Sequence, residues 1–401
     1  MIISASNWQR PKLKDADTIS AQVISMLNQI ETDGDDAIDK LALQFDQINP
    51  QFIELKPFDD YQLPEALATA IKLAATRIED FAKFQKQSVK NQSFTDEYGS
   101  FGQVVQPIER VGAYIPGGRY PLISTALMTL IPAKIAGSSV RIACSPSINP
   151  AILAAASLAG ATQFIQMGGV QAIAALAYGY QQNTPVDLIV GPGNAWVNEA
   201  KKQVQSRIKI DGLAGPSELL AICDNKQPVE WLAYDALAQA EHDPLACSII
   251  ISDDQDWLTS MQEYLNSKSD FAELIENKQI ELILGQSKEQ LLAFSEAYAP
   301  EHLMLCHEAI KPDELTNYGS LFVGANSAVA LGDYITGPNH TLPTLGFARQ
   351  TGGLSVNTFL RIQTIQTVND LGRKELSKSA MQIADAEGLV NHYESLKIRT
   401  L

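Results

Sequence analysis

Two polar residues near the end of one expected helix have the types and spacing to do chemistry together. Gln239 and His242 lie three apart in LAQAEHDPL, and upstream apolar residues repeat at helical spacing until Pro244 ends the pattern. Residues at i and i+3 share one helix face, so an amide and an imidazole point the same way. That arrangement suits a metal ligand pair. Taken alone, it equally suits a polar helix end whose histidine caps the last carbonyl groups.

A carboxylate adjoins an imidazole further along the chain. Glu301 and His302 are neighbours in APEHLM, where an apolar strand is expected to begin straight after Pro300. A carboxylate and an imidazole at a strand end can transfer protons to and from a substrate. The alternative is an ordinary surface dipeptide with no function.

One expected loop is unusually long. The stretch GDYITGPNHTLPT, residues 332–344, carries Asp333 and His340 and is punctuated by glycine and proline. Long loops in a chain of short ones are usually functional. Together with Gln239 and His242 this loop offers nitrogen and oxygen donors suited to zinc, manganese or a similar ion. The spacing matches no HExxH or cysteine pattern, so the residues favour a metal without establishing one.

Three glycine-rich segments leave expected strands: YIPGG at 114–118, MGG at 167–169 and GPGN at 191–194. Glycine lets main-chain N–H groups approach a phosphate at a helix start, and ligands of open parallel sheets lie beyond the carboxyl ends of strands. None of the three is a GxGxxG fingerprint. A nucleotide site and a set of plain strand-to-helix turns therefore both remain open.

The elements that must position these residues alternate between strand and helix. Apolar runs typical of strands begin near Val111, Val140, Phe164 and Leu188, and a second series begins at Leu219, Ser248, Glu281, His302 and Ser320. Strict alternation predicts parallel sheets with helices on both faces. We predict an α/β protein with two lobes of incomplete Rossmann-like, parallel-sheet architecture. After about Asn357 the strand rhythm stops, which predicts a mostly helical C-terminal tail.

The expected boundaries follow from this rhythm. Residues 18–110 read as mainly helical and are expected to complete the lobe of residues 219–356, which holds the polar candidates. Residues 111–218 form the other lobe, which holds the glycine-rich segments. Residues 1–17 and 357–401 are expected to be tails.

Composition narrows the class of protein. The chain has 401 residues and a formal net charge of −16, which argues against nucleic acid or an anionic membrane as a partner. The N-terminus lacks the features of a secretion signal, and the apolar stretch from Ala151 is too short to span a bilayer. No CxxC motif joins the four cysteines, which are expected to be core residues in a reducing compartment. We therefore expect a cytoplasmic protein.

Eight motifs occur here in an order that resembles the histidinol dehydrogenase family, from about residue 20 to the C-terminus. They are YIPGGxxPLxSTxLM, GGxQAIAALAxG, GPGNxxVxEAK, AGPSE, QAEH, PEHL, GDYxxGxNHxLPT and EGLxxH. The resemblance implies a zinc- and NAD-dependent enzyme that oxidises L-histidinol to histidinal and then to L-histidine, the last steps of histidine biosynthesis.

The resemblance also implies roles for single residues. Glu301 would activate water and His302 would act as the base. The implied zinc ligands are Gln239, His242, Asp333 and His392. The implied NAD contacts are Tyr114, Gln171 and Asn194. The implied substrate-binding set is Ser217, Gln239, His242, His302, Asp333, His340, Glu387 and His392.

By the same resemblance, residues 111–218 would bind NAD, and 18–110 with 219–356 would carry the metal and the catalytic pair. The segments 1–17 and 357–401 would take part in dimerisation, so that the tail of one subunit completes the site of its partner. Two features depart from the family pattern. Asp243 stands where the family usually has glycine after QAEH, and the segment before residue 20 matches poorly.

Three other classes of function were weighed against this one. A metal hydrolase could use zinc and Glu301 in the same way, but it would not need the glycine-rich edge of residues 111–218. A non-catalytic binding protein would not be expected to keep Glu301 and His302. The closer rival is a family relative that oxidises another amino alcohol or a diol, although Glu387 and His392, which the family uses for the imidazole substrate, are both present.

Overall fold

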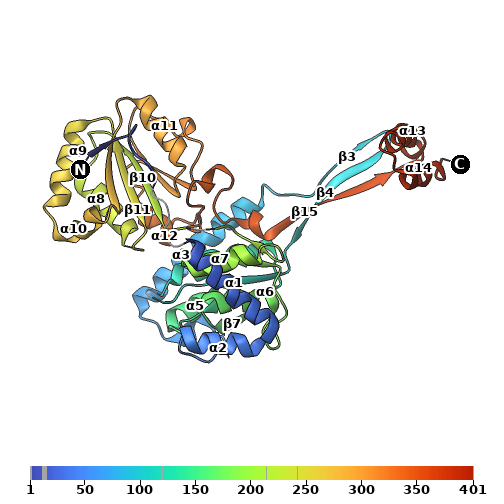
Figure 1. Cartoon of the computed structure of the whole chain (residues 1–401), viewed down its shortest axis with the longest axis horizontal. Helices are drawn as coiled ribbons and strands as arrows, with labels where there is room; N and C mark the ends of the chain where they lie inside the picture. The colour runs from blue at the N-terminus through green and yellow to red at the C-terminus, as the bar shows by residue number, and fades with distance from the viewer. Residues whose placement is uncertain (1, 11–15, 119–120, 214, 242, 401) are drawn as a thin grey trace.

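The computed structural model describes residues 2–10, 16–118, 121–213, 215–241 and 243–400. Figure 1 shows two α/β lobes side by side and a narrow arm that extends away from them and carries the C-terminus at its tip. The predicted α/β class with two parallel-sheet lobes is confirmed. Among the described residues, no helix combines the length and apolar character needed to cross a membrane.

The first lobe is built on a six-stranded sheet in the order β2-β7-β6-β5-β8-β9. All neighbours are parallel except β2 and β7, which are antiparallel. Its strands are β2 (Gln51–Ile53), β5 (Arg110–Tyr114), β6 (Val140–Ser145), β7 (Gln163–Gln166), β8 (Leu188–Val190) and β9 (Lys209–Ile210). Because helices cover both faces, consecutive residues of the central strands are buried and apolar, as in Leu188–Val190 of β8.

In the described part of the chain, seven α-helices cover the two faces of this sheet. They are α1 (Ala16–Asp33), α2 (Asp35–Phe45), α3 (Glu65–Lys86), α4 (Ile123–Ala136), α5 (Pro150–Ala159), α6 (Gly169–Tyr178) and α7 (Ala195–Val204). Helices α3, α4 and α5 share one buried cluster with the sheet, and α1, α2, α6 and α7 share the other.

The N-terminal helices therefore pack differently from our expectation, which attached residues 18–110 to the lobe of residues 219–356. Val23 and Ile38 lie in the core beneath α6 and α7, and Ile78 lies in the core beneath α4. Apolar periodicity shows that one face of a helix is buried, but it does not show which sheet covers that face.

The second lobe has a six-stranded, fully parallel sheet in the order β1-β12-β11-β10-β13-β14. Its strands are β1 (Ile2–Ser4), β10 (Glu218–Cys223), β11 (Cys247–Ser252), β12 (Ile280–Leu284), β13 (His302–Cys306) and β14 (Ser320–Val323). Its helices are α8 (Val229–Ala240), α9 (Gln255–Asn266), α10 (Ser269–Glu276), α11 (Lys288–Tyr298) and α12 (Val329–Tyr334). The start of the chain, expected to be a tail, thus supplies an edge strand.

The arm is an antiparallel three-stranded sheet, β15-β4-β3, followed by two helices (Figure 1). Its elements are β3 (Gln92–Asp96), β4 (Gly99–Pro107), β15 (Leu360–Val368), α13 (Asp370–Ala386) and α14 (Val390–Lys397). The expectation that strands stop near Asn357 is wrong, because β15 follows that residue. Ile362, Ile365 and Val368 repeat every third residue, which is a helical rather than an alternating pattern.

Candidate active site

The Glu301–His302 pair lies at the amino end of the second sheet. Helix α11 ends at Tyr298, Ala299 turns the chain with a φ of 49°, and His302 is the first residue of β13. Strand β10 begins beside it at Glu218, since Leu219 is in register with His302. The glycine-rich turns follow β5, β7 and β8, so they lie at the carboxyl end of the first sheet.

His302 is almost fully buried and surrounded by polar partners. Its Nδ1 lies 2.9 Å from Gln239 Nε2 and 3.1 Å from the main-chain oxygen of Glu218. An amide N–H only donates and a carbonyl oxygen only accepts, so Nδ1 has a partner in either ring tautomer. The other nitrogen, Nε2, is buried without a hydrogen bond and lies 3.7 Å from Asp333 Oδ1. The ring is thus fixed on one side and has a free nitrogen on the other.

Two carboxylates set the basicity of this imidazole. Burial alone disfavours the imidazolium ion, but the charges of Glu301 and Asp333 outweigh it and raise the pKa of His302 above its usual value. Glu301 Oε2 is 3.5 Å from His302 Nδ1 and also accepts the main-chain N–H of Glu218 at 2.8 Å. A buried base next to an oriented carboxylate can carry out acid–base chemistry.

The predicted metal ligands are only partly brought together. Gln239 and Asp333 lie on opposite sides of His302, through Nδ1 and Nε2 respectively. His242 falls outside the described residues. His392 is exposed on α14, at the far end of the arm from both lobes in Figure 1, and Glu387 is exposed just before it. The structure of one chain therefore does not bring His392 or Glu387 to His302.

The donor atoms around His302 are of the kinds that a zinc ion accepts. Amide oxygen, carboxylate oxygen and imidazole nitrogen are all accepted zinc ligands, and His302 Nε2 is an orphaned buried atom beside Asp333. Within the described residues, however, no group of three or more His, Cys, Asp or Glu could hold a metal. The residues fit zinc in kind, but a full set needs donors in addition to the described residues that lie beside His302.

The long loop lies between the lobes. His340 Nδ1 donates to the carbonyl oxygen of Asp333 at 2.9 Å, and its Nε2 is 3.4 Å from Thr125 Oγ1 on α4. Asn339 Nδ2 donates to the carbonyl oxygen of Met128 at 2.5 Å. Burial is the main cause that lowers the pKa of His340, and nearby Asp333 offsets it only in part. His340 is therefore a neutral neighbour of the His302 site at neutral pH.

Ser217 lies near the Glu301–His302 pair at the amino end of the second sheet, because it directly precedes Glu218 at the start of β10. Its carbonyl oxygen accepts the N–H of Cys247 at 3.0 Å.

All four cysteines are free, and burial raises the pKa of the Cys144 thiol well above its usual range. The prediction that Cys144 is a structural core residue agrees with its complete burial.

The three predicted NAD contacts lie at the glycine-rich turns. Tyr114 ends β5 and its hydroxyl oxygen accepts the N–H of Gly169 at 3.4 Å. Gln171 is buried in α6, and Asn194 caps α7 by accepting the N–H groups of Trp196 and Val197. These three positions lie at the carboxyl end of the first sheet, as the alternation of strands and helices predicts.

Asp46 also lies at the carboxyl end of the first sheet, and the sequence analysis did not identify it. Its Oδ2 accepts the N–H of Gly168 at 2.8 Å and Gln171 Nε2 at 2.9 Å. A carboxylate of the protein thus occupies the start of α6, where a phosphate was one of the two open interpretations. Asp46 lies just beyond α2 in a run with no distinctive spacing, so nothing in the sequence marks it.

A buried ion pair fixes the glycine-rich turn that follows β8. Lys201 Nζ lies 2.5 Å from Asp211 Oδ1 and donates to the carbonyl oxygen of Gly191 at 2.9 Å. Asp211 Oδ2 accepts the N–H of Gly191 at 2.7 Å. Gly191 has a φ of 111°, and a Cβ there would lie 2.1 Å from the carbonyl oxygen of Tyr114. Glycine is needed at this position for close approach to β5.

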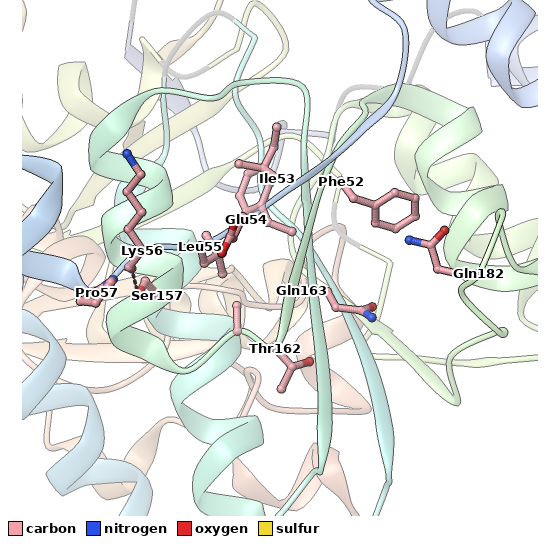
Figure 2. A pocket seen from close by; sticks show the side chains of 12 residues that line it. Phe52, Ile53, Glu54, Leu55, Lys56, Pro57, Ser157, Thr162, Gln163 and Gln182 are labelled. Atoms are coloured by element: carbon pink, nitrogen blue, oxygen red, sulfur yellow. Dashed lines mark hydrogen bonds between the residues drawn. The ribbon is translucent and has the colours of Figure 1, made fainter.

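A surface pocket of about 590 Å³ lies elsewhere, at the edge of the first sheet. Figure 2 shows some of the side chains that line it, with Leu55 on the left, Phe52 and Gln182 on the right and Gln163 below them. Ser157 Oγ donates to the carbonyl oxygen of Lys56 at 2.6 Å beside it. None of the predicted site residues lines this pocket.

Comparisons with known proteins all point to one family. The family model described as histidinol dehydrogenase matches residues 9–400. A histidinol dehydrogenase of Methanothermobacter thermautotrophicus is 38% identical over 96% of this chain and 94% of its own length. One of Thermus thermophilus is 39% identical over 95% of each chain. A crystal structure of histidinol dehydrogenase from Elizabethkingia anophelis matches with a TM-score of 0.86 and 33% identity, over 98% of this chain and 97% of that one.

Proposed function

Because this chain belongs to the histidinol dehydrogenase family, we propose that it oxidises L-histidinol through histidinal to L-histidine, with two NAD reduced in succession. The observation that carries the proposal is the buried Glu301–His302 pair, whose two side chains both contact the main chain of Glu218. Removal of a hydride from an alcohol requires a base for the hydroxyl proton, and His302 has a buried nitrogen free to take it.

The two residues of the pair have different tasks in this proposal. His302 accepts the hydroxyl proton in the first oxidation and a proton of the hydrated aldehyde in the second. Glu301 orients and activates the water that adds to the aldehyde, because its Oε2 is already held by the Glu218 N–H. NAD, when bound, supplies the hydride acceptor. The tight burial of the pair limits competing exchange with bulk water.

We propose that a zinc ion is held by Gln239, His242, Asp333 and His392 of the partner subunit. When bound, zinc supplies Lewis-acid polarisation of the substrate and helps to orient it. Gln239 and Asp333 both lie next to His302, and this shared proximity supports the assignment. Asp243, adjacent to His242, would add negative charge near the ion.

The arm supports a homodimer in which each subunit completes the other's site. It exposes many large apolar side chains that one chain leaves uncovered, namely Ile362, Ile365, Val368, Leu371, Ile383, Val390 and Ile398. Exposed apolar patches of this kind mark association surfaces. In a two-fold dimer the arm would carry Glu387 and His392 to the partner's His302.

The remaining assignments are also proposals. Tyr114, Gln171 and Asn194 would contact NAD, and Ser217, His340 and Glu387 would contact the substrate. The residues 111–218 would bind NAD, whereas 219–356 would provide the metal and the catalytic pair. We place the reaction in the cytoplasm, which the four free cysteines support because reducing compartments keep thiols unpaired.

One stoichiometric experiment tests the proposal. The purified protein is mixed with limiting L-histidinol and excess NAD, and NADH is counted by its absorbance. Two NADH for each histidinol consumed is the expected result. One NADH with accumulated aldehyde, or turnover of other amino alcohols or diols in preference to histidinol, would contradict it.

The metal is tested separately. A strong chelator should abolish turnover and zinc should restore it, because in this proposal the bound ion polarises and orients the substrate. Zinc content, measured on the protein as purified, should fall in His242→Asn. Full activity of protein shown to be free of metal would refute the zinc assignment.

A further inference from the structure

Arg10 connects the N-terminal segment to the amino end of the second sheet. Its guanidinium forms an ion pair with Glu218 and donates to the main-chain carbonyl of Tyr298. It also lies over the Tyr298 ring, 4.0 Å from the ring centroid. Trp8 anchors this segment, with ring centroids 5.3 Å from Phe294 and 5.4 Å from Tyr298.

Glu218 lies between Arg10 and the catalytic pair. Its main-chain N–H donates to Glu301 Oε2 at 2.8 Å, and its carbonyl oxygen is 3.1 Å from His302 Nδ1. Residue Glu218 is 4% exposed, and its Oε1 is the atom that pairs with Arg10. One residue therefore contacts both catalytic side chains through its backbone and Arg10 through its carboxylate.

We propose that Arg10 is a positioning residue for Glu301 and His302, acting through Glu218. The inference rests on the proposed function, which assigns proton transfer to this pair. A buried carboxylate that loses its ionic partner is strongly destabilised, so it turns toward solvent or draws in another donor. Either response moves the Glu218 backbone, and with it the two groups that this backbone orients. The N-terminal segment thereby becomes part of the active-site support.

The chain offers a matched control in Arg349. Its guanidinium donates to the carbonyl oxygens of Glu296 and Ala297, next to the Tyr298 carbonyl that Arg10 contacts. Both arginines thus satisfy carbonyls at the end of α11. Within the described part of the chain, the contacts of Arg349 do not include Glu218. Arg349→Gln removes the helix-end contacts alone, whereas Arg10→Gln also removes the ion pair.

The experiment compares four variants of the full-length protein: Arg10→Gln, Arg10→Lys, Arg349→Gln and the double variant Arg10→Gln/Glu218→Gln. Arg10→Gln should lower kcat about tenfold in both oxidations, with KM for histidinol changed less than about threefold and zinc content unchanged. Arg10→Lys should recover part of the loss, since lysine keeps the charge but not the forked geometry. The double variant should recover most of it, because no buried carboxylate is left unpaired.

A second measurement does not depend on turnover. The chain has five histidines, so the ring signals of labelled histidine can be assigned by NMR spectroscopy. The His302 signal should move in Arg10→Gln and stay in place in Arg349→Gln. An unmoved His302 signal, an unchanged kcat, or equal losses in Arg10→Gln and Arg349→Gln would overturn the proposal. If the unmodified protein forms no NADH from histidinol, the proposed function fails, while the NMR comparison still decides the role of Arg10.

Discussion

His302 and Glu301 both contact the main chain of Glu218, but they differ in how their reactive atoms are held. His302 Nε2 is free of hydrogen bonds, whereas Glu301 Oε2 is held by Glu218. His302→Asn should slow both oxidations by roughly 10²–10⁴-fold with zinc still bound, because both remove a proton. Glu301→Gln should slow mainly the oxidation of supplied histidinal, because water enters only that step. Single-turnover assays with each substrate measure the two steps. An equal loss in both steps for Glu301→Gln would contradict the division of tasks.

Asp235 lies in the middle of α8, where partial burial disfavours the charged form of its carboxyl group. Desolvation raises the pKa of Asp235 to about 6, above the ordinary value of 3.8. The folded state therefore binds its proton more tightly than the unfolded state, and this contribution to stability is lost as pH rises from about 4 through 6. Asp235→Asn should stabilise the protein at pH 8 by about 1 kcal/mol, a value discounted for solvent screening because the group is only partly buried.

Thermal unfolding at pH 8 and at the lowest pH the protein tolerates would measure this difference. The gain from Asp235→Asn should shrink as the pH falls, and Asp256→Asn on the neighbouring α9 serves as a control for loss of charge. An equal gain in stability at both pH values would show that burial of the charged Asp235 carboxylate does not destabilise the folded state.

Some site residues were identifiable from the chain alone and others were not. Glu301 and His302 stood out because a charged pair directly preceded an apolar strand, and Gln239 stood out by helical spacing. Asp46, Asp211 and Arg10 carry no such signal. Each acts through a partner more than a hundred residues away or through a main-chain N–H group, and neither contact leaves a periodic pattern in the sequence.

Among the elements, the turn after β8 depends on a buried charge pair. Lys201→Met would leave Asp211 buried beside Gly191 without its cation, which should cost about 3–5 kcal/mol of unfolding free energy. The adjacent Lys202 is about half exposed, so Lys202→Met should change stability by less than about 0.5 kcal/mol. Urea unfolding of both variants makes the comparison. Similar small losses in the two would mean that the buried pair does not hold this turn.

The order of strands and helices in both lobes was predictable because apolar runs of strand length alternate with helical stretches. The predicted strand starts at His302 and Ser320 match the structure. The arm was not predictable in the same way. Strand β15 is exposed on most of its length, so it lacks the apolar alternation that burial on one face imposes.

On the scale of the whole molecule, the arm places His392 far from the lobes of its own chain (Figure 1). Chains with His242→Asn and chains with His392→Asn should each be inactive. Unfolded and refolded together, they pair at random, so about half of the dimers are mixed and each mixed dimer has one intact site. Activity should return to about a quarter of the unmutated level.

The control is each variant refolded alone, which should stay inactive. If His392 served its own chain, the mixture would contain no intact site and would also stay inactive. Zinc bound per chain provides an independent reading, because only intact sites should hold the ion tightly.

The pairing of β15 with β4 joins two segments that lie far apart in the sequence in one small sheet. Leu360 is in register with Pro107, and Val368 with Gly99. On the ribosome, β3 and β4 emerge early, while β15 follows almost the entire chain. Throughout synthesis β4 therefore presents an open hydrogen-bonding edge to its surroundings, which is a known template for aggregation. The nascent protein depends on its last segment to protect one of its first, and a translation product that stops before residue 360 keeps that edge exposed permanently.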